Sequence, residues 1–272
     1  MSRYEISLDL SEYGHLDEFA LLACQDYNFG NESKWFNAFR GGLYGFRARV
    51  NGFLSHYQIV HAWIPTPRQP NETEHHLASI FFCMDSSIEC FAYALNALGF
   101  AARPDLFRDV KIDRSLRQIS PKDILGEDPT KLSKVPVLGY KTVFPTLQMY
   151  WQSNSDVIGI IIEQHDVSKH RETIFEGGKS RSDPPSGFYE SIGIQENDEI
   201  KWMYEPMAEI ILRNNPKSAH VAKKSQEVKD FITLESLADK FVNFIQESGK
   251  LAFQDAKENI ELKHTNFSSR DE

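Results

Sequence analysis

Residues 76–99, HLASIFFCMDSSIECFAYALNALG, decide the fold of this chain. The apolar residues of this stretch recur every three to four positions, which is the period of an α-helix. They are Leu77, Ile80, Phe81, Met84, Ile88, Phe91, Ala92, Leu95 and Leu98. Small residues such as Cys83 and Ala94 lie on another side and allow a second helix to pack closely. Gly99 stands where a left-handed residue ends many helices. The pattern predicts a buried central helix over Leu77–Leu98.

A second apolar pattern of helical period covers Asn31 to Trp63. Four glycines interrupt it, and each costs about 1 kcal/mol relative to alanine inside a helix. We therefore expect them to mark close approach of the central helix. They are Gly41, Gly42, Gly45 and Gly52. Prolines at 65, 67 and 70 form a stiff connector that returns the chain antiparallel to this helix.

Further helices are predicted over His15–Tyr27, after Ser120-Pro121, from Pro145, and after Thr233. The run 157–162 is rich in β-branched residues, so a buried strand remains an alternative to helix there. A short strand is expected over Met207–Leu212.

The chain therefore predicts a mainly α fold, an antiparallel helical bundle around a buried central helix with an irregular loop-rich insertion and a short strand or two. With no internal repeat and no clear linker, we expect one domain over residues 1–263. Residues 101–143 and 173–225 are expected as loop-rich elaborations, with 176–200 as loop, and 264–272 as a frayed tail.

The composition is that of a globular chain with a substantial core. Of 272 residues, 41% are hydrophobic and 12% aromatic. The net charge of −9 argues against a broad DNA-binding surface, though not against a local basic patch. Three widely spaced cysteines make no disulfide framework, which favours a reducing cytoplasm. We expect no signal peptide, and no apolar run that reaches the roughly 18 residues of a membrane span.

Asp85 and Glu89 are four residues apart, so both carboxylates lie on one face of the predicted central helix and repel one another. When buried, such acids need cationic partners or a raised pKa. One interpretation is a structural pair neutralised by Arg40, Arg47 or Arg49 of the preceding helix. The other is a polar pocket in the bundle core, held by the two acids.

The densest cluster of titratable side chains is EQHDVSKHR, which begins at Glu163. Asp166 and His170 are four residues apart and share a helical face. Such a set suits acid–base chemistry on a phosphodiester or, with further ligands, a divalent metal. A polar helix end, where cationic side chains favour the negative end of the dipole, explains the same residues. The candidate catalytic residues are His170 and His165, and the candidate substrate-binding residues are Lys169 and Arg171.

Two further motifs carry weaker signals. Gly177-Gly178-Lys179-Ser180 is similar to the end of a P-loop, but Thr173 stands where that motif requires glycine. Lys179 and Arg181, with the backbone N–H groups of the two glycines, can still hold a phosphate, although an ordinary surface loop is the commoner explanation. The dipeptide His165-Asp166 also occurs in HD-type metal phosphohydrolases, but no histidine precedes it at the distance that family requires.

A larger set of residues resembles bacterial proteins that are similar to the HEPN superfamily of helical bundles. The set comprises Phe82, Asp85, Ser86, Glu89, the run ALNALG at 94–99, and Lys169-His170-Arg171. The resemblance implies a helical bundle that often dimerises. Many HEPN proteins are ribonucleases of toxin or phage-defence systems, which cut RNA without metal by an arginine and a histidine separated by four to six residues.

By position, the resemblance makes His170 the catalytic histidine. This chain departs from the pattern, because no arginine precedes His170 at that spacing and His165 holds the position of the arginine at the shortest spacing. Arg49 and His56 have the spacing, but on another helix.

The expected function is therefore that of a cytoplasmic HEPN-like protein that cleaves or binds RNA in a defence or toxin-type role, as a homodimer, with no cofactor and no metal. In this interpretation His170 is the general acid/base, Lys169 and Arg171 contact phosphate, and Asp85 and Glu89 hold the pocket. The alternatives are a non-enzymatic helical interaction or dimerisation module and a metal-dependent phosphohydrolase.

Overall fold

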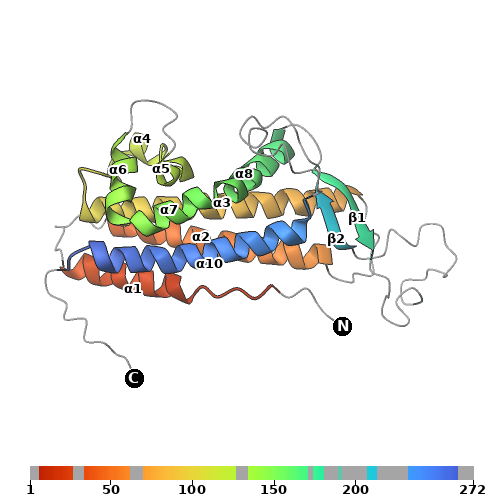
Figure 1. The fold of residues 1–272 in the computed structure, drawn as a ribbon, viewed down its shortest axis with the longest axis horizontal. Coiled ribbons are helices and arrows are strands. Elements are labelled where there is room, and N and C mark those ends of the chain that lie inside the picture. Colours follow the sequence, from red (N-terminus) through yellow and green to blue (C-terminus); the bar gives the residue numbers. More distant parts are fainter. Residues whose placement is uncertain are drawn as a thin grey trace, which may run out of the picture. The chain divides into compact units, whose positions relative to one another are not determined.

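The computed structural model describes residues 6–26, 34–61, 70–126, 134–170, 174–180, 190, 207–212 and 232–262 (Figure 1). The described chain is mainly helical, as predicted. Its helices are α1 (Ser11–Asp26), α2 (Lys34–His61), α3 (Pro70–Ala102), α4 (Asp113–Leu116), α5 (Pro121–Leu125), α6 (Lys134–Val143), α7 (Pro145–Ser153), α8 (Ser155–His170) and α10 (Leu234–Asn259). Strands β1 (Phe175–Ser180) and β2 (Met207–Leu212) pair antiparallel.

The chain divides into two compact units. Unit 1 comprises the described parts of Met1–Ser7, Arg49–Asp85 and Asp156–Val242. Unit 2 comprises the described parts of Leu8–Ala48, Ser86–Ser155 and Asn243–Glu272. The candidate site lies in unit 1.

In both units α2 packs antiparallel to α3 through glycines of α2. In unit 2, Gly42 lies against the backbone of Cys90 and Ala94, and Gly45 lies against the Cys90 side chain. In unit 1, Gly52 lies against the sulfur of Cys83. The small residues of α3 thus meet the glycines of α2, which confirms the predicted close approach at these three glycines but not at Gly41, where a side chain would meet no neighbour within 4 Å.

Two neighbouring glycines of α2 give a matched test of this packing. We expect Gly42→Ala to destabilise the fold by about 1–3 kcal/mol, because the added methyl group overlaps the α3 backbone. Gly41→Ala is expected to stabilise it by about 0.5–1 kcal/mol, because alanine favours helix and no atom obstructs it. Urea unfolding of both variants measures the difference; equal effects would contradict the packing.

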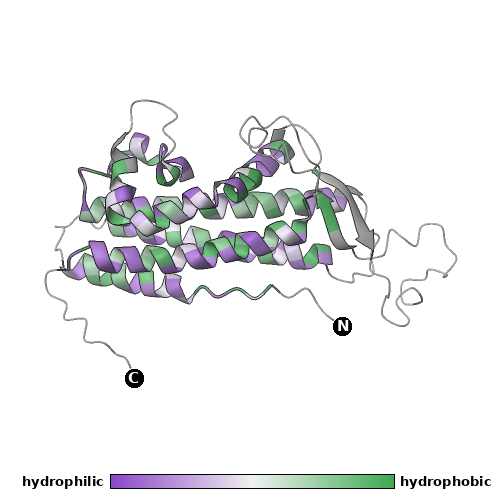
Figure 2. Cartoon of the chain, in the orientation of Figure 1, coloured by the Kyte–Doolittle hydropathy of each residue, from purple (hydrophilic) through white to green (hydrophobic). Residues whose placement is uncertain are grey.

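Most of α3 is buried, as predicted for the central helix. Leu77, Ile80, Phe81 and Met84 are buried in unit 1, and Ile88, Phe91, Leu95 and Leu98 in unit 2. Figure 2 shows hydrophobic residues recurring along α3, whereas α10 alternates between hydrophobic and hydrophilic residues along its length. The burial of α3 is interrupted on one side, where His75, Phe82 and Glu89 are exposed at intervals of seven residues. The central helix therefore keeps one narrow exposed stripe.

Two boundaries differ from the sequence prediction. Gly99 does not end α3, which continues to Ala102. The missing side chain of Gly99 instead leaves room for the Phe107 ring, which lies where a Cβ atom would stand. Among the described glycines only Gly126, after α5, has a positive φ. Residues 176–180, the start of the predicted loop 176–200, belong instead to β1, because β2 supplies a hydrogen-bonding partner for this backbone.

Several other local predictions are confirmed. The run 157–162 is helical and belongs to α8. Residues 207–212 form β2. Ser120 is the N-cap of α5, and the Thr233 hydroxyl accepts the N–H of Ser236 in the first turn of α10. Short helices occupy the described part of 101–143. The tail 264–272 lies outside the described residues, and the single domain stays a prediction.

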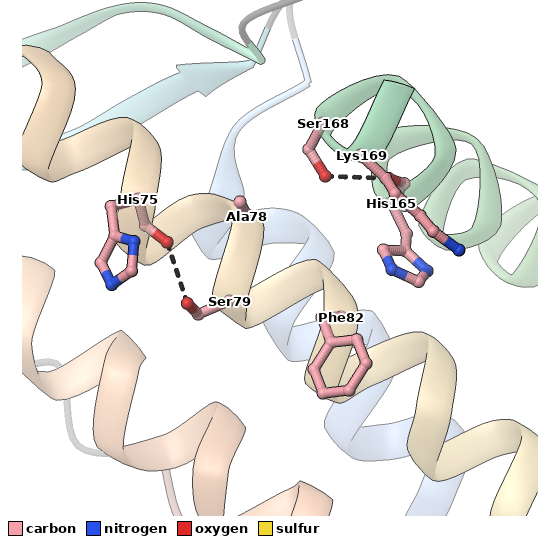
Figure 3. A pocket seen from close by; sticks show the side chains of 7 residues that line it. All are labelled: His75, Ala78, Ser79, Phe82, His165, Ser168 and Lys169. Carbon is pink, nitrogen blue, oxygen red and sulfur yellow. Dashed lines mark hydrogen bonds between the residues drawn. The ribbon is translucent and has the colours of Figure 1, made fainter. Parts of the chain in front are cut away.

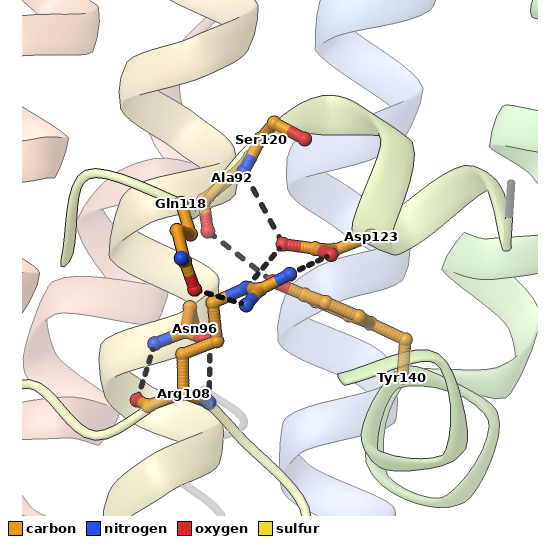
Figure 4. Close-up of polar contacts among 7 residues, drawn as sticks. All are labelled: Ala92, Asn96, Arg108, Gln118, Ser120, Asp123 and Tyr140. Atoms are coloured by element: carbon orange, nitrogen blue, oxygen red, sulfur yellow. Dashed lines mark hydrogen bonds and ion pairs between the residues drawn. The ribbon is translucent and has the colours of Figure 1, made fainter. Parts of the chain in front are cut away.

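A polar network in unit 2 fastens the segment after α3 (Figure 4). The guanidinium of Arg108 donates two hydrogen bonds to Asp123, at 2.9 and 2.8 Å, and one to Gln118. The side chain of Asn96 pairs with the backbone N–H and C=O of Arg108, as a neighbouring strand would. The side chains of Arg108 and Asp123 are only 13% and 8% exposed, so this ion pair is largely shielded from water.

Two long-range hydrogen bonds tie α10 to the rest of unit 2. The Tyr13 hydroxyl donates to the carbonyl of Ile245 at 2.6 Å, 232 residues away in sequence. The carboxylate of Asp255 accepts the N–H of Leu147 at 2.8 Å. The side chain of Phe144, the N-cap residue of α7, accepts no hydrogen bond from the first turn of that helix. The carboxylate of Asp255, which belongs to α10, accepts one instead.

Glu72–Ala102 of α3 is the one described helix that is long and apolar enough to cross a membrane, which differs from the sequence prediction. Of its most apolar 18-residue window, 61% is buried inside the protein. The cysteines at 24, 83 and 90 are all free.

Candidate functional site

The candidate site is formed by α3 and α8 in unit 1. The apolar face of α8, which includes Ile158, Ile161 and Val167, is buried and sets the orientation of the helix. Beyond α8, the N–H of Ile174 donates to both carboxylate oxygens of Glu74, at 2.9 and 3.1 Å. This contact fastens the chain after α8 near the start of α3.

His165 and Asp85 form the polar centre of the site. His165 Nδ1 lies 2.6 Å from Asp85 Oδ2, and the two side chains are 14% and 10% exposed. Burial raises the pKa of Asp85, whereas the hydrogen bond and the charge of His165 act in the opposite direction. An ionised carboxylate can only accept a hydrogen bond, so beside ionised Asp85 the neutral tautomer of His165 is the one that carries its proton on Nδ1 and leaves Nε2 able to accept one.

Phe82 lies beside this pair with 43% of its surface exposed. Its ring meets the His165 ring edge to face, with centroids 5.6 Å apart, and the Cζ atom of Arg49 lies 5.3 Å from its centroid. The Arg49 Nε atom is buried and has no hydrogen-bond partner among the described residues. An aromatic ring, an imidazole and a guanidinium thus meet at one place.

A cavity of about 260 Å³ opens over this place (Figure 3). It is lined by His75, Ala78, Ser79 and Phe82 of α3 and by His165, Ser168 and Lys169 of α8. Both serine hydroxyls donate within their own helices, Ser79 to the carbonyl of His75 and Ser168 to that of His165. Neither is therefore held as a nucleophile activated by His165.

A second pair of histidines lies nearby in unit 1. His56 Nδ1 of α2 is 3.1 Å from His76 Nδ1 of α3, and the rings of His75 and His76 meet edge to face at 5.4 Å. Burial, followed by the charge of His75, lowers the pKa of His56. Arg49 and His56, which have the HEPN spacing, thus face different partners on α3: Phe82 and His76.

The structure brings together three of the residues proposed from sequence, Asp85, His165 and Lys169. Glu89 belongs to unit 2 and is exposed, so it does not share the buried setting of Asp85. His170 is the last residue of α8, and its side chain lies outside the described part of the structure. Arg171 and Arg181 also lie outside it, as does the side chain of Lys179, whose backbone belongs to β1.

The predicted cations of α2 are arranged differently from expectation. Arg40 pairs with Asp17 of α1 at 3.5 Å, and the partner of Asp85 is His165 rather than an arginine. Of the three arginines considered, Arg49 contacts the site, through the Phe82 ring and not through a carboxylate.

Sequence reasoning did not single out His75, Ser79 or Phe82 as pocket residues. The available signal was their spacing, because positions 75, 79 and 82 lie on one helical face. This face carries polar and aromatic residues where a fully buried helix would carry aliphatic ones.

Among the described residues, no group of three or more His, Cys, Asp or Glu side chains is placed to hold a metal ion. The His-Asp dipeptide does not act as a unit, since His165 pairs with Asp85 and Asp166 is exposed.

Comparison of this chain with protein-family models, curated proteins and solved structures gave no match.

Proposed function

We propose that the chain is a HEPN-like, metal-independent ribonuclease of the bacterial cytoplasm with a defence or toxin-type role, and that His165 is its general base. One observation carries the proposal: an imidazole oriented by a buried carboxylate lies against an exposed aromatic ring that a guanidinium also contacts. A base held by an orienting acid is the usual arrangement for proton abstraction.

The site holds a base but no activated nucleophile among its described residues, which favours a substrate that brings its own. A serine nucleophile must be hydrogen-bonded to the base. The hydroxyls of Ser79 and Ser168 donate to backbone carbonyls instead. RNA carries its nucleophile, the ribose 2′-hydroxyl, next to every phosphodiester, whereas DNA lacks it.

The proposed reaction is an internal transesterification. Nε2 of His165 takes the proton of the 2′-hydroxyl while that oxygen attacks phosphorus. The bond from phosphorus to the 5′-oxygen breaks, and this oxygen takes up a proton from water. The products are a 2′,3′-cyclic phosphate and a 5′-hydroxyl end, and His165 then returns its proton to water.

The residues around His165 suit an RNA ligand despite the net charge of −9. Lys169 lines the cavity with an exposed ammonium group, and Arg49 adds a second positive charge beside Phe82. The ammonium group of Lys169 can contact a phosphate oxygen in the cavity, whereas Arg49 contributes its charge through the Phe82 ring. Aromatic rings that are open to solvent stack unpaired bases, at about 1–3 kcal/mol per base. The ring of Phe82 is the exposed aromatic surface of this cavity.

The test is cleavage of a single-stranded RNA by the purified chain in EDTA, with DNA of the same sequence as control. We expect RNA fragments that end in a 2′,3′-cyclic phosphate and no cleavage of DNA, because DNA has no 2′-hydroxyl. Cleavage of DNA at a similar rate would contradict the proposal. Activity that EDTA abolishes would favour the metal-dependent phosphohydrolase instead.

The second candidate function is a non-enzymatic dimerisation module. It is favoured by the large apolar side chains that unit 2 exposes. They are Leu21, Tyr44, Ile112, Leu138 and Met149, the last at 63% exposure. Sedimentation with and without RNA separates the two functions, since a dimerisation module associates without RNA and leaves it uncut.

A further inference from the structure

We infer that His75 is a second catalytic residue of the site, the general acid that protonates the leaving 5′-oxygen. The inference rests on the proposed ribonuclease function. In it, the proton that the leaving 5′-oxygen takes up comes from the imidazole of His75 and not from water. His165 then acts as base and His75 as acid in one turnover, and water exchanges their protons between turnovers.

The two histidines lie at the two ends of one cavity. His75 and Phe82 are seven residues apart on α3, which is about 10 Å along the helix axis. His165 packs against Phe82, so it stands at the opposite end of the cavity from His75. Figure 3 shows this order, with His75, Ser79 and Phe82 following one another along α3 and His165 reaching in from α8 beside Phe82.

In-line displacement at phosphorus requires this separation. The attacking and leaving oxygens lie on opposite sides of the phosphorus atom, so a base and an acid that act on them in the same step must also lie on opposite sides. A phosphoryl group with a hydrogen bond of about 2.8 Å at each of these oxygens spans a length comparable to the helical rise between His75 and Phe82. His165 alone cannot reach both oxygens at once.

His75 has the surroundings of a residue that exchanges protons with solvent. Its side chain is exposed and also lines the cavity. The ring of His76 meets it edge to face, and His76 is in turn hydrogen-bonded to His56, which limits the positions that the His75 ring can take. Histidine is the side chain that readily gives and takes a proton near neutral pH.

The experiment measures cleavage of two RNA substrates by the purified 272-residue chain. One is an ordinary RNA dinucleotide linkage, and the other carries sulfur in place of the bridging 5′-oxygen. A thiolate leaves without protonation, so it does not require a general acid. We expect the His75→Ala variant to cleave the ordinary linkage with a kcat about 100-fold below that of the wild type. The same variant is expected to cleave the sulfur linkage close to the wild-type rate.

His165→Ala is expected to lose activity on both linkages, because both need the base. His15→Ala, at an exposed histidine of α1, is the matched control and is expected to cleave both at the wild-type rate. Equal loss on both linkages in His75→Ala, or no loss on either, would overturn the role of His75 while leaving the ribonuclease function intact. Absence of cleavage by the wild-type chain would overturn both.

Discussion

His165→Ala is expected to lower the rate of RNA cleavage by about 10³- to 10⁴-fold, the upper part of the range for loss of a general base. The variant loses the Nε2 atom that accepts the 2′-hydroxyl proton, while Lys169 and Phe82, which line the cavity, can still hold the substrate. We therefore expect kcat to fall and KM to change little, as measured by initial rates in EDTA. A variant that retains cleavage within the range of the His15→Ala control would remove His165 from the mechanism.

Asp85→Asn tests the same centre without removing the base. An asparagine amide donates to Nδ1, which moves the ring proton to Nε2 and blocks the basic atom. We expect a loss of about 10²- to 10⁴-fold in kcat, as for orienting aspartates in hydrolytic triads.

The stability of Asp85→Asn is expected to move in the opposite direction from its activity. Burial raises the pKa of Asp85, so the native protein binds this proton more tightly than the unfolded chain does. The free energy of unfolding of the wild type therefore falls relative to that of Asp85→Asn as the pH rises. The fall begins near the ordinary aspartate pKa and is complete above the raised pKa of the native protein. Urea unfolding in acid and at neutral pH measures the difference, and a variant that is less stable than wild type only at neutral pH would contradict it.

Arg108→Ala is expected to destabilise the fold by about 3–5 kcal/mol, the usual cost of removing one partner of a buried ion pair. The change leaves Asp123 shielded from water without the two hydrogen bonds that compensate its charge. It also removes the hydrogen bond to Gln118. Chemical unfolding at neutral pH measures the loss.

The chain supplies a matched control for Arg108. Arg103 makes a similar pair with Asp105, but the two side chains are 47% and 62% exposed, so we expect Arg103→Ala to leave the unfolding midpoint unchanged. Replacement of both Arg108 and Asp123 by apolar residues of similar size is expected to cost less than Arg108→Ala alone. If Arg108→Ala and Arg103→Ala unfold at the same midpoint, then burial does not determine how much the Arg108–Asp123 and Arg103–Asp105 ion pairs contribute to stability.

The helices were predictable because each needs only a local pattern. The apolar period of Leu77–Leu98 and the glycines facing Cys83, Cys90 and Ala94 gave the central helix and its partner. The predicted end of α3 was wrong because Gly99 was interpreted as a helix terminator. The glycine instead makes room for the ring of Phe107, a residue outside the helix that the local pattern does not reveal. Strand β1 was missed because its stability depends on β2, which lies more than 25 residues away in sequence.

The candidate site was predictable only in part, for the same reason. Local sequence marks His165 and Lys169 as neighbours on one helix, and marks Asp85 as an acid that needs a partner. It does not show that Asp85 pairs with a residue 80 positions away, or that Arg49 reaches Phe82. Glu89 was assigned with Asp85 because helical spacing gives their common face but not the extent to which neighbouring helices cover each residue.

The hydrogen bond between Tyr13 and Ile245 also has a consequence for synthesis on the ribosome. The chain is made from its N-terminus, so α1, α2 and α3 emerge long before the segment that completes unit 2. Until α10 is translated, the apolar side chains of unit 2 that α10 later covers, including the ring of Tyr13, remain exposed to water and to other nascent chains. We expect the nascent protein to depend on chaperones during this interval, and C-terminal truncations to aggregate rather than to persist as smaller domains.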